Sequence, residues 1–321
     1  MSNSQIKPSI LIITGMHRSG TSLTASLLQS AGLDIGQRLI EPGHGNVRGF
    51  FENRDFLEFH EMVLRSQGLH DGGWTLQENI KVEQQYVEKA KELISKNASS
   101  PMWGWKEPRT TLFLDFWSKF LPDANFLLIY RSPWEVVDSL YRRGDKTFIN
   151  QPDLAVKIWM RYNQNILDFY NKFTERCLLV SAYSVVNRTQ DLIEAIKAKF
   201  KMNLAAPAPK IYEPSLFCNQ VSDTERATLI RFYFPEALTT YQKLNQREDL
   251  FSEADKVSWF EKVPTFPDKS TAFQDWLNTR HLELQLKSLR SELEQARYQL
   301  KQTQAELAAQ SNNANTDRES E

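Results

Sequence analysis

The chain has 321 residues, of which 41% are hydrophobic, and a formal net charge of −1 from 39 Lys and Arg against 40 Asp and Glu. This balance argues against bulk attraction to nucleic acid or an anionic membrane, and no apolar run approaches the roughly 20 residues that cross a bilayer. The two cysteines, Cys177 and Cys218, indicate neither a disulfide framework nor a zinc site. We therefore expect a cytoplasmic protein with one large domain and an appendage.

The first predicted strand is an apolar run that ends at Gly15, and a helical pattern follows over 21–28. Gly15 and Gly20 make a Gly-x-x-x-x-Gly loop, whose backbone amides can close around an anion at the helix N-terminus. Arg18 and the hydroxyls of Thr21 and Ser22 add further donors. The segment therefore predicts a phosphate-binding loop.

This loop resembles a Walker A loop, but Thr21 stands where such a loop needs a lysine to reach the outer phosphates. No strand ends in an aspartate suited to magnesium, and the strand best placed for that role ends in Arg131, a donor for another anion. An ATP-dependent, P-loop kinase-like enzyme is therefore the disfavoured alternative.

Strand patterns recur along the chain and alternate with helical patterns. This alternation predicts an α/β fold, a P-loop-NTPase-like parallel sheet flanked by helices. Ligands of such sheets bind outside the carboxyl ends of the strands, where Gly15, Lys106 and Arg131 fall. The expected strands are 9–14, 102–106, 125–130 and 177–182, and the expected helices are 20–31, 53–67, 109–121, 134–142, 153–175, 188–200 and 223–244.

Four segments together resemble the sulfotransferase family over roughly residues 8 to 220. Residues 17–22, His-Arg-Ser-Gly-Thr-Ser, look like the family's 5′-phosphosulfate loop, and Arg131 with Ser139 resembles its 3′-phosphate site. Residues 105–109, Trp-Lys-Glu-Pro-Arg, resemble its lysine-containing strand end beside the transferred sulfuryl group. Residues 181–183, Ser-Ala-Tyr, resemble the segment whose tyrosine contacts adenine, although acidic residues that often follow in the family are missing here.

The resemblance implies a sulfotransferase fold and a transferase that uses 3′-phosphoadenosine 5′-phosphosulfate (PAPS) as donor, without a metal. The acceptor would be a hydroxyl or amine, and Lys106 and Arg18 would neutralise charge on the leaving oxygen. The residues expected to bind the donor are Gly15, His17, Arg18, Ser19, Gly20, Thr21, Ser22, Arg131, Ser139 and Tyr183.

A base must take the proton of the acceptor. Residues 46–52 resemble the Gly-aromatic-x-Glu segment of some sulfotransferases, and Glu52 is therefore the expected base. Glu52 can equally be an ordinary charge before a helix capped by Asn53. The remaining candidates are His44, Asp55, His17 and Glu107.

A glycan is the first expectation for the acceptor, because several aromatic residues can offer flat faces to sugar rings. Core packing explains most of these aromatics equally well. Small alcohols, lipids and peptidyl tyrosine therefore stay open as acceptors. The aromatic residues concerned are Phe50, Phe51, Trp74, Trp103 and Trp105.

A heptad pattern begins at Leu282 and continues to Leu307, with apolar positions in alternating steps of four and three. It predicts a coiled-coil helix that pairs with itself or with a helix of another protein, and a single surface helix is the plainer alternative. A coiled-coil scaffold with a non-catalytic nucleotide-binding domain is the remaining alternative for the whole chain. The expected divisions are 1–250 as the α/β domain, 251–274 as a linker, 275–309 as the coiled-coil helix and 310–321 as a disordered tail.

Overall fold

The computed structural model describes residues 8–41, 49–208, 225–250 and 269–318. Four strands form one parallel sheet in the order β2-β1-β3-β4, which confirms the predicted sheet. The strands are apolar because helices bury both faces of the sheet. Their bounds are β1 Ser9–Thr14, β2 Met102–Lys106, β3 Asn125–Tyr130 and β4 Cys177–Ser181.

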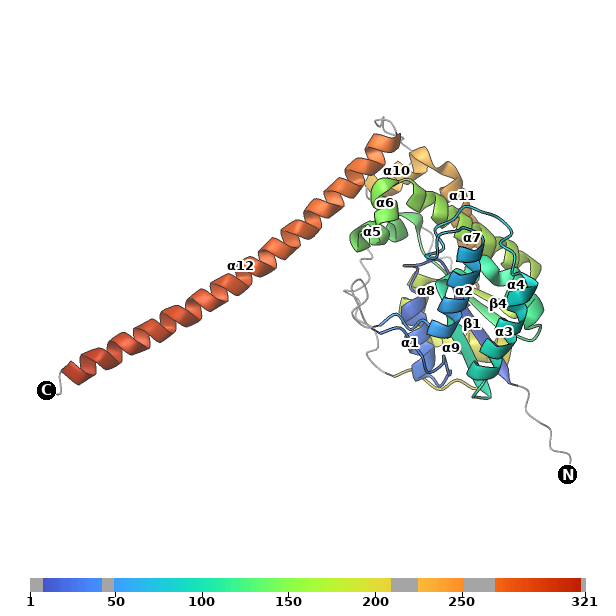
Figure 1. Ribbon diagram of the computed structural model, residues 1–321, viewed down its shortest axis with the longest axis horizontal. Coiled ribbons are helices and arrows are strands. Elements are labelled where there is room, and N and C mark those ends of the chain that lie inside the picture. Colours follow the sequence, from blue (N-terminus) through green and yellow to red (C-terminus); the bar gives the residue numbers. More distant parts are fainter. Residues whose placement is uncertain (1–7, 42–48, 209–224, 251–268, 319–321) are drawn as a thin grey trace, which may run out of the picture. The chain divides into compact units, whose positions relative to one another are not determined.

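Helices surround this sheet, and Figure 1 shows them on both of its faces. The α-helices are α1 Thr21–Ser30, α2 Arg54–Ser66, α3 Gln84–Asn97, α4 Leu114–Phe120, α5 Pro133–Arg143, α6 Lys146–Asn150, α7 Leu154–Lys172, α8 Ala182–Asn187, α9 Thr189–Phe200, α10 Glu225–Tyr233, α11 Pro235–Arg247 and α12 Lys269–Arg318. In the described residues there are also two 3-10 helices, η1 Pro108–Phe113 and η2 Thr174–Arg176.

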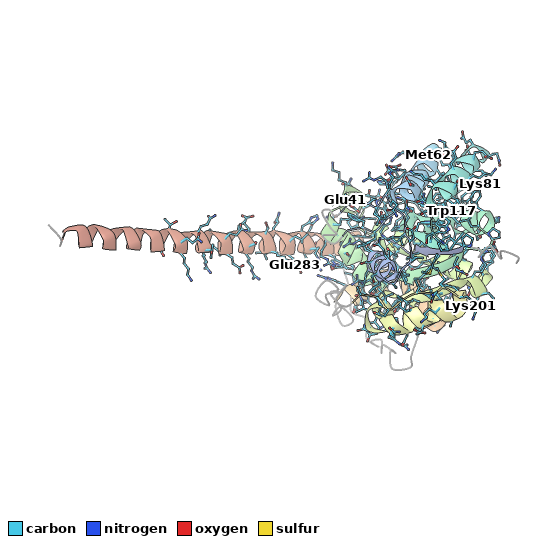
Figure 2. All side chains as sticks on the ribbon, turned by 90° about the horizontal axis from the view of Figure 1, so that it is seen from below. Glu41, Met62, Lys81, Trp117, Lys201 and Glu283 are labelled. Atoms are coloured by element: carbon cyan, nitrogen blue, oxygen red, sulfur yellow. The ribbon has the colours of Figure 1, made fainter. Side chains whose placement is uncertain are left out.

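The core has two halves, because alternate strand residues point to opposite faces of the sheet. On one face, Leu11, Ile129 and Val180 pack with apolar residues of α1 and α9. On the other face, aromatic side chains fill the space: Phe126 meets Phe169 of α7 edge to face, with ring centroids 4.7 Å apart. The side chains of this part of the chain are drawn in Figure 2.

Several helices differ from the sequence expectation. α3 and α6 were not expected, although the buried Tyr86, Ala90 and Leu93 of α3 have helical spacing. The stretch expected as one helix over 223–244 is two helices, because α11 starts at Pro235, which has no N–H to continue α10. The stretch expected at 109–121 begins instead as the 3-10 helix η1.

The chain divides into two compact units, Met1–Phe273 and Gln274–Glu321. α12 continues to Arg318 and so extends over most of the segment expected as a disordered tail; neither glycine nor proline interrupts it. Most of the expected linker, residues 251–268, lies outside the described residues. Figure 2 shows the described side chains of α12, with Glu283 labelled. Among the described helices, none combines the length and apolar character needed to cross a membrane.

Gly104 allows β1 and β2 to pair closely. A Cβ atom at this position would lie 1.8 Å from the carbonyl oxygen of Leu11. We expect Gly104→Ala to lower the free energy of unfolding by more than about 2 kcal/mol, since the strands would have to separate. Urea denaturation measures this, with Ser95→Ala on the exposed side of α3 as a nearly neutral control. Equal stability of the two variants would contradict this role of Gly104.

Candidate functional site

The loop between β1 and α1 is built by close backbone contacts at the carboxyl edge of the sheet. A Cβ atom on Gly15 would lie 2.0 Å from the carbonyl oxygen of Ile129 on β3, so only glycine fits there. Gly20 caps α1 with a φ of 91°, and Arg18 adopts a φ of 70°, which is uncommon for a residue with a side chain. Such backbone strain is concentrated at binding sites.

Two buried polar atoms of this loop point to a ligand. His17 Nε2 and Ser19 Oγ have no hydrogen-bond partner among the described residues. The exposed fractions of these residues are 8% and 0%. Buried polar atoms of native proteins are nearly always hydrogen-bonded, so both atoms fit a bound anion or its protons. The loop therefore has the donors that a phosphosulfate or phosphate group needs.

The structure brings the loop to the serine expected at a second phosphate site. Arg18 Nε donates a hydrogen bond to Ser139 Oγ of α5 at 2.8 Å. Burial, together with the charges of Arg143, Arg142 and Arg131, lowers the pKa of Arg18 to about 10. The guanidinium groups thus repel one another, and an anion placed among them would relieve that repulsion.

Arg131 follows directly after β3 and is oriented by its neighbours. Its guanidinium donates to Glu135 at 2.9 Å, and its carbonyl oxygen accepts a 3.0 Å hydrogen bond from the Trp159 indole. Ser132 also bonds to Glu135. A strand end and a helix N-terminus therefore hold the arginine in place beside the cationic cluster.

A second group of expected residues converges on Lys106, the last residue of β2. The ammonium group of Lys106 donates to Ser22 Oγ at 3.1 Å, to the Phe50 carbonyl at 2.9 Å and to Glu52 Oε1 at 2.9 Å. Lys106 is only 1% exposed, and burial lowers its pKa although the charge of Glu52 opposes this effect. Phe51, next to Glu52, has a φ of 52°.

The carboxylate of Asp55, a candidate base, is instead held by three hydrogen-bond donors. It receives hydrogen bonds from Arg38, from Lys96 at 3.0 Å and from Asn97 at 3.3 Å. Burial alone would raise the pKa of Asp55, but these donors lower it. Asn53 caps α2 by accepting from the Asp55 amide, so the expected helix cap is present. His44, another candidate base, lies outside the described residues.

Glu107 forms a buried structural network that the sequence did not reveal. Its carboxylate accepts hydrogen bonds from Arg109 at 2.6 Å and from His60 Nδ1 at 2.7 Å. Trp117 donates to His60 Nε2 at 2.8 Å, so that nitrogen is an acceptor and Nδ1 carries the proton. Burial opposes ionisation, but Arg109 and His60 hold the pKa of Glu107 well below its ordinary range.

His17 stands on the side of the loop that faces aromatic residues. Its ring centroid is 4.7 Å from that of Trp74 and 6.3 Å from that of Tyr162. Burial and the nearby cations, Arg109 first, lower the pKa of His17 well below its ordinary value, so the imidazole is neutral. Trp74 also lies 5.4 Å from the Arg143 guanidinium. The position of Trp74 beside the loop could not be predicted from the sequence, because Trp74 lies in a segment without regular secondary structure.

The remaining expected residues have different environments. Tyr183 follows β4 in α8 and is 54% exposed, so it is no core aromatic, but no described contact joins it to the loop or to Arg131. Trp103 and Trp105 are fully buried core residues, and Trp105 stacks on Phe56 at 3.9 Å. They are therefore not platforms for a sugar.

The fold and site define an α/β protein of the phosphate-binding-loop type, with two cationic positions at the carboxyl edge of its parallel sheet. The sequence profile described as "Sulfotransferase family" matches residues 8–205. The chain belongs to this sulfotransferase family. No curated protein matches the chain. Within the described residues, no group of His, Cys, Asp and Glu is arranged to hold a metal ion.

Solved structures of sulfotransferases are similar to the chain. The sulfotransferase domain of the Synechococcus PCC 7002 olefin synthase has 20% identity and a TM-score of 0.45, covering 75% of this chain and 94% of that one. A sulfotransferase from Alicyclobacillus acidocaldarius has 14% identity and a TM-score of 0.41, covering 75% and 97%. One from Mycobacterium tuberculosis H37Rv has 15% identity and a TM-score of 0.43, covering 61% and 68%.

The Glu107 network should make stability depend on pH. The folded pKa of Glu107 lies below its unfolded value, so its contribution is present above the unfolded pKa and is lost as the pH falls toward the folded one. We expect Glu107→Gln to lower stability at pH 7 and to flatten its decline below about pH 5. Urea midpoints from pH 7 to pH 3 measure this.

The exposed Glu88, which pairs with Lys91 on α3, offers a matched control. Glu88→Gln should keep the wild-type decline. If Glu107→Gln kept it too, the buried carboxylate would not be the group responsible.

Proposed function

We propose that this sulfotransferase-family protein moves a sulfuryl group from PAPS to a hydroxyl or amine acceptor. The observation that carries the proposal is the hydrogen bond between Arg18 of the loop and Ser139 of α5. It joins the two segments that would hold the 5′ and 3′ ends of one nucleotide. The single buried free thiol described, Cys177, suits the reducing cytoplasm that we propose as its location.

Two separate groups of anion-binding residues support the choice of donor. Ser19, His17 and the N-terminus of α1 would hold the 5′-phosphosulfate, and Arg131 with Ser139 would hold the 3′-phosphate. Arg18 belongs to the loop and donates to Ser139, and burial together with the charges of Arg143, Arg142 and Arg131 lowers its pKa. A nucleotide with two separated anionic groups matches this arrangement better than one with a single phosphate chain. Tyr183 is the proposed adenine contact, because it exposes its ring just after β4.

PAPS supplies a sulfuryl group attached to a phosphate leaving group. Transfer breaks the bond from sulfur to the phosphate oxygen, forms a bond from sulfur to the acceptor oxygen or nitrogen, and releases the acceptor proton. Lys106, held by Ser22 and Phe50, would neutralise the charge that develops on the leaving oxygen. Glu52 would accept the proton, because it is the carboxylate directly beside Lys106.

The ion pair between Lys106 and Glu52 links these two roles. In this structure the Lys106 ammonium donates a hydrogen bond to Oε1 of Glu52, so that oxygen is already engaged. Negative charge arriving beside Lys106 would compete for its ammonium protons and free the Glu52 carboxylate. Glu52 would thus become available as the base only when the donor is bound. The carboxylates of Asp55 and Glu107 are instead hydrogen-bonded to other cations, Lys96 and Arg109 respectively.

We propose a glycan as the acceptor. The half-buried Phe50, Phe51 and Trp74 lie close to Glu52, Lys106 or His17, and aromatic faces suit sugar rings. The deciding experiment incubates the protein with sulfur-labelled PAPS and separate fractions of glycans, lipids, small alcohols and peptides. Label in the glycan fraction supports the proposal, and label in another fraction corrects the acceptor. Hydrolysis of ATP would favour a kinase-like enzyme, and donor binding without any transfer would favour a scaffold.

The 3′-phosphate site can be tested by binding alone. Adenosine 3′,5′-bisphosphate should bind more tightly than AMP, and Arg131→Ala should remove most of the difference. A charge-assisted contact of this kind contributes about 1.5–3 kcal/mol, which corresponds to an affinity change of roughly tenfold to a hundredfold. Calorimetry measures both affinities. Arg65→Ala, which removes an exposed arginine of α2, is the matched control and should leave them unchanged.

Substitutions in the ion pair between Lys106 and Glu52 should affect turnover much more than nucleotide binding. Lys106→Ala would leave Glu52 as an unpaired buried charge, so the double variant Lys106→Met with Glu52→Gln is the safer test of fold. We expect each of Lys106→Met, Glu52→Gln and the double variant to lower turnover at least a hundredfold, while affinity for adenosine 3′,5′-bisphosphate changes much less. EDTA should leave the wild-type rate unchanged. Wild-type turnover in a single variant would refute the role of that residue.

A further inference from the structure

α12 carries a row of exposed leucines along its described length. Five leucines of this row are between 51% and 60% exposed. Isolated helices gain little stability in water, so a long helix with such an apolar row is stabilised chiefly by burying it against another surface. The five leucines are Leu282, Leu286, Leu289, Leu293 and Leu300.

The spacing of these leucines defines a coiled-coil register. Steps of four and three residues alternate, so each leucine belongs to one of the two core positions of a heptad, a or d. The a positions are 286, 293 and 300, and the d positions are 282, 289, 296 and 303. Ala296 and Thr303 make the d positions smaller toward the end of the helix.

The charged residues that flank the core decide which partner fits. In a parallel pair of helices, position g of one helix faces position e of the next heptad on the other. Glu292 is at g and Arg297 is at e, so in two copies of this chain each Glu292 faces Arg297 of the second copy. The twofold symmetry of a homodimer makes this attractive pair twice.

The antiparallel arrangement is unfavourable for the same residues. When two antiparallel copies overlap fully, a positions face d positions and e faces e. Arg290 then lies opposite Arg297 of the second copy, and symmetry repeats this like-charge contact. Glu292 at g would face only Gln299 and gain no ion pair. Charge therefore favours the parallel orientation and disfavours the antiparallel one.

We propose that α12 pairs with α12 of a second copy of this chain as a parallel, in-register, two-stranded coiled coil. Two strands are favoured because Arg290, Glu292 and Arg297 stay at the exposed edges of such a pair, whereas larger bundles bury these positions more deeply. Since both chains run in the same direction, two sulfotransferase units join the coil at the same end. This pairing does not depend on the donor or the acceptor of the proposed reaction.

Cysteine cross-linking of the full chain reports the orientation directly. Position 296 faces its own copy in the parallel register and faces position 293 in the antiparallel one. Ala296→Cys should therefore form a disulfide-linked dimer when glutathione disulfide is added, and reduction should reverse it. The unsubstituted chain, with its own two cysteines, is the control. Light scattering of the unsubstituted chain should also give the mass of two chains.

Charge reversal provides a second test that does not rely on disulfides. Arg297→Glu replaces two attractive pairs by two repulsive ones in the parallel dimer, so dimer affinity should fall on the order of tenfold. In the antiparallel dimer the same change removes the repulsion and should strengthen pairing. Glu292→Arg should also weaken the parallel dimer, and a mixture of the two variants should form heterodimers.

Matched controls reverse a charge outside the flanking positions. Lys301→Glu and Glu294→Arg lie at position b and should leave dimer affinity near wild type, with helicity checked by circular dichroism. A monomeric or larger mass for the full chain would overturn the two-stranded pairing. Cross-linking only between Leu293→Cys and Ala296→Cys chains, or stronger pairing of Arg297→Glu, would overturn the parallel orientation.

Discussion

The arrangement of the site depends on burying positive charge at the carboxyl ends of parallel strands. Lys106 ends β2 and Arg131 follows β3, the two strands that flank β1, and the loop after β1 adds Arg18. Taking such charges out of water is unfavourable unless each has a partner. Lys106 has Glu52, and Arg131 has Glu135. Burial, together with the charges of the neighbouring arginines, lowers the pKa of Arg18, and an anion placed there would offset both effects.

A network of hydrogen bonds around the site holds the site residues in position. Thr14, the last residue of β1, donates to the carbonyl oxygen of Glu107, and the Glu107 carboxylate holds Arg109 and His60. Arg109 in turn donates to the carbonyl oxygen of Asp71 at 2.6 Å. This connects the end of β2 to the irregular segment that carries Trp74 toward His17. The network therefore fixes both the strand end with Lys106 and the aromatic side of the loop.

Local patterns explain which parts of the fold could be predicted. The strands and the loop are short segments whose apolar runs and glycines are decided by neighbouring residues, and their bounds agree closely with the structure. α3 was missed because its buried residues are separated by many charged ones. The break before Pro235 has a local cause, yet the surrounding helical pattern concealed it. Trp103 and Trp105 could not be assigned to core or surface until neighbouring helices covered them.

The sequence by itself indicated the type of site, because the loop motif, the arginine after β3 and the lysine that ends β2 can each be recognised within a few residues. It also supplies the heptad spacing on which the register proposed for α12 rests. Only the tertiary structure decided which carboxylate lies beside Lys106 and which ones serve other partners. Glu52, Asp55 and Glu107 look alike in a sequence, but the partners that surround them come from distant segments; Lys106 and Glu52 are 54 positions apart. Contacts over such distances arise only when the sheet and its helices pack together, so no local pattern encodes them.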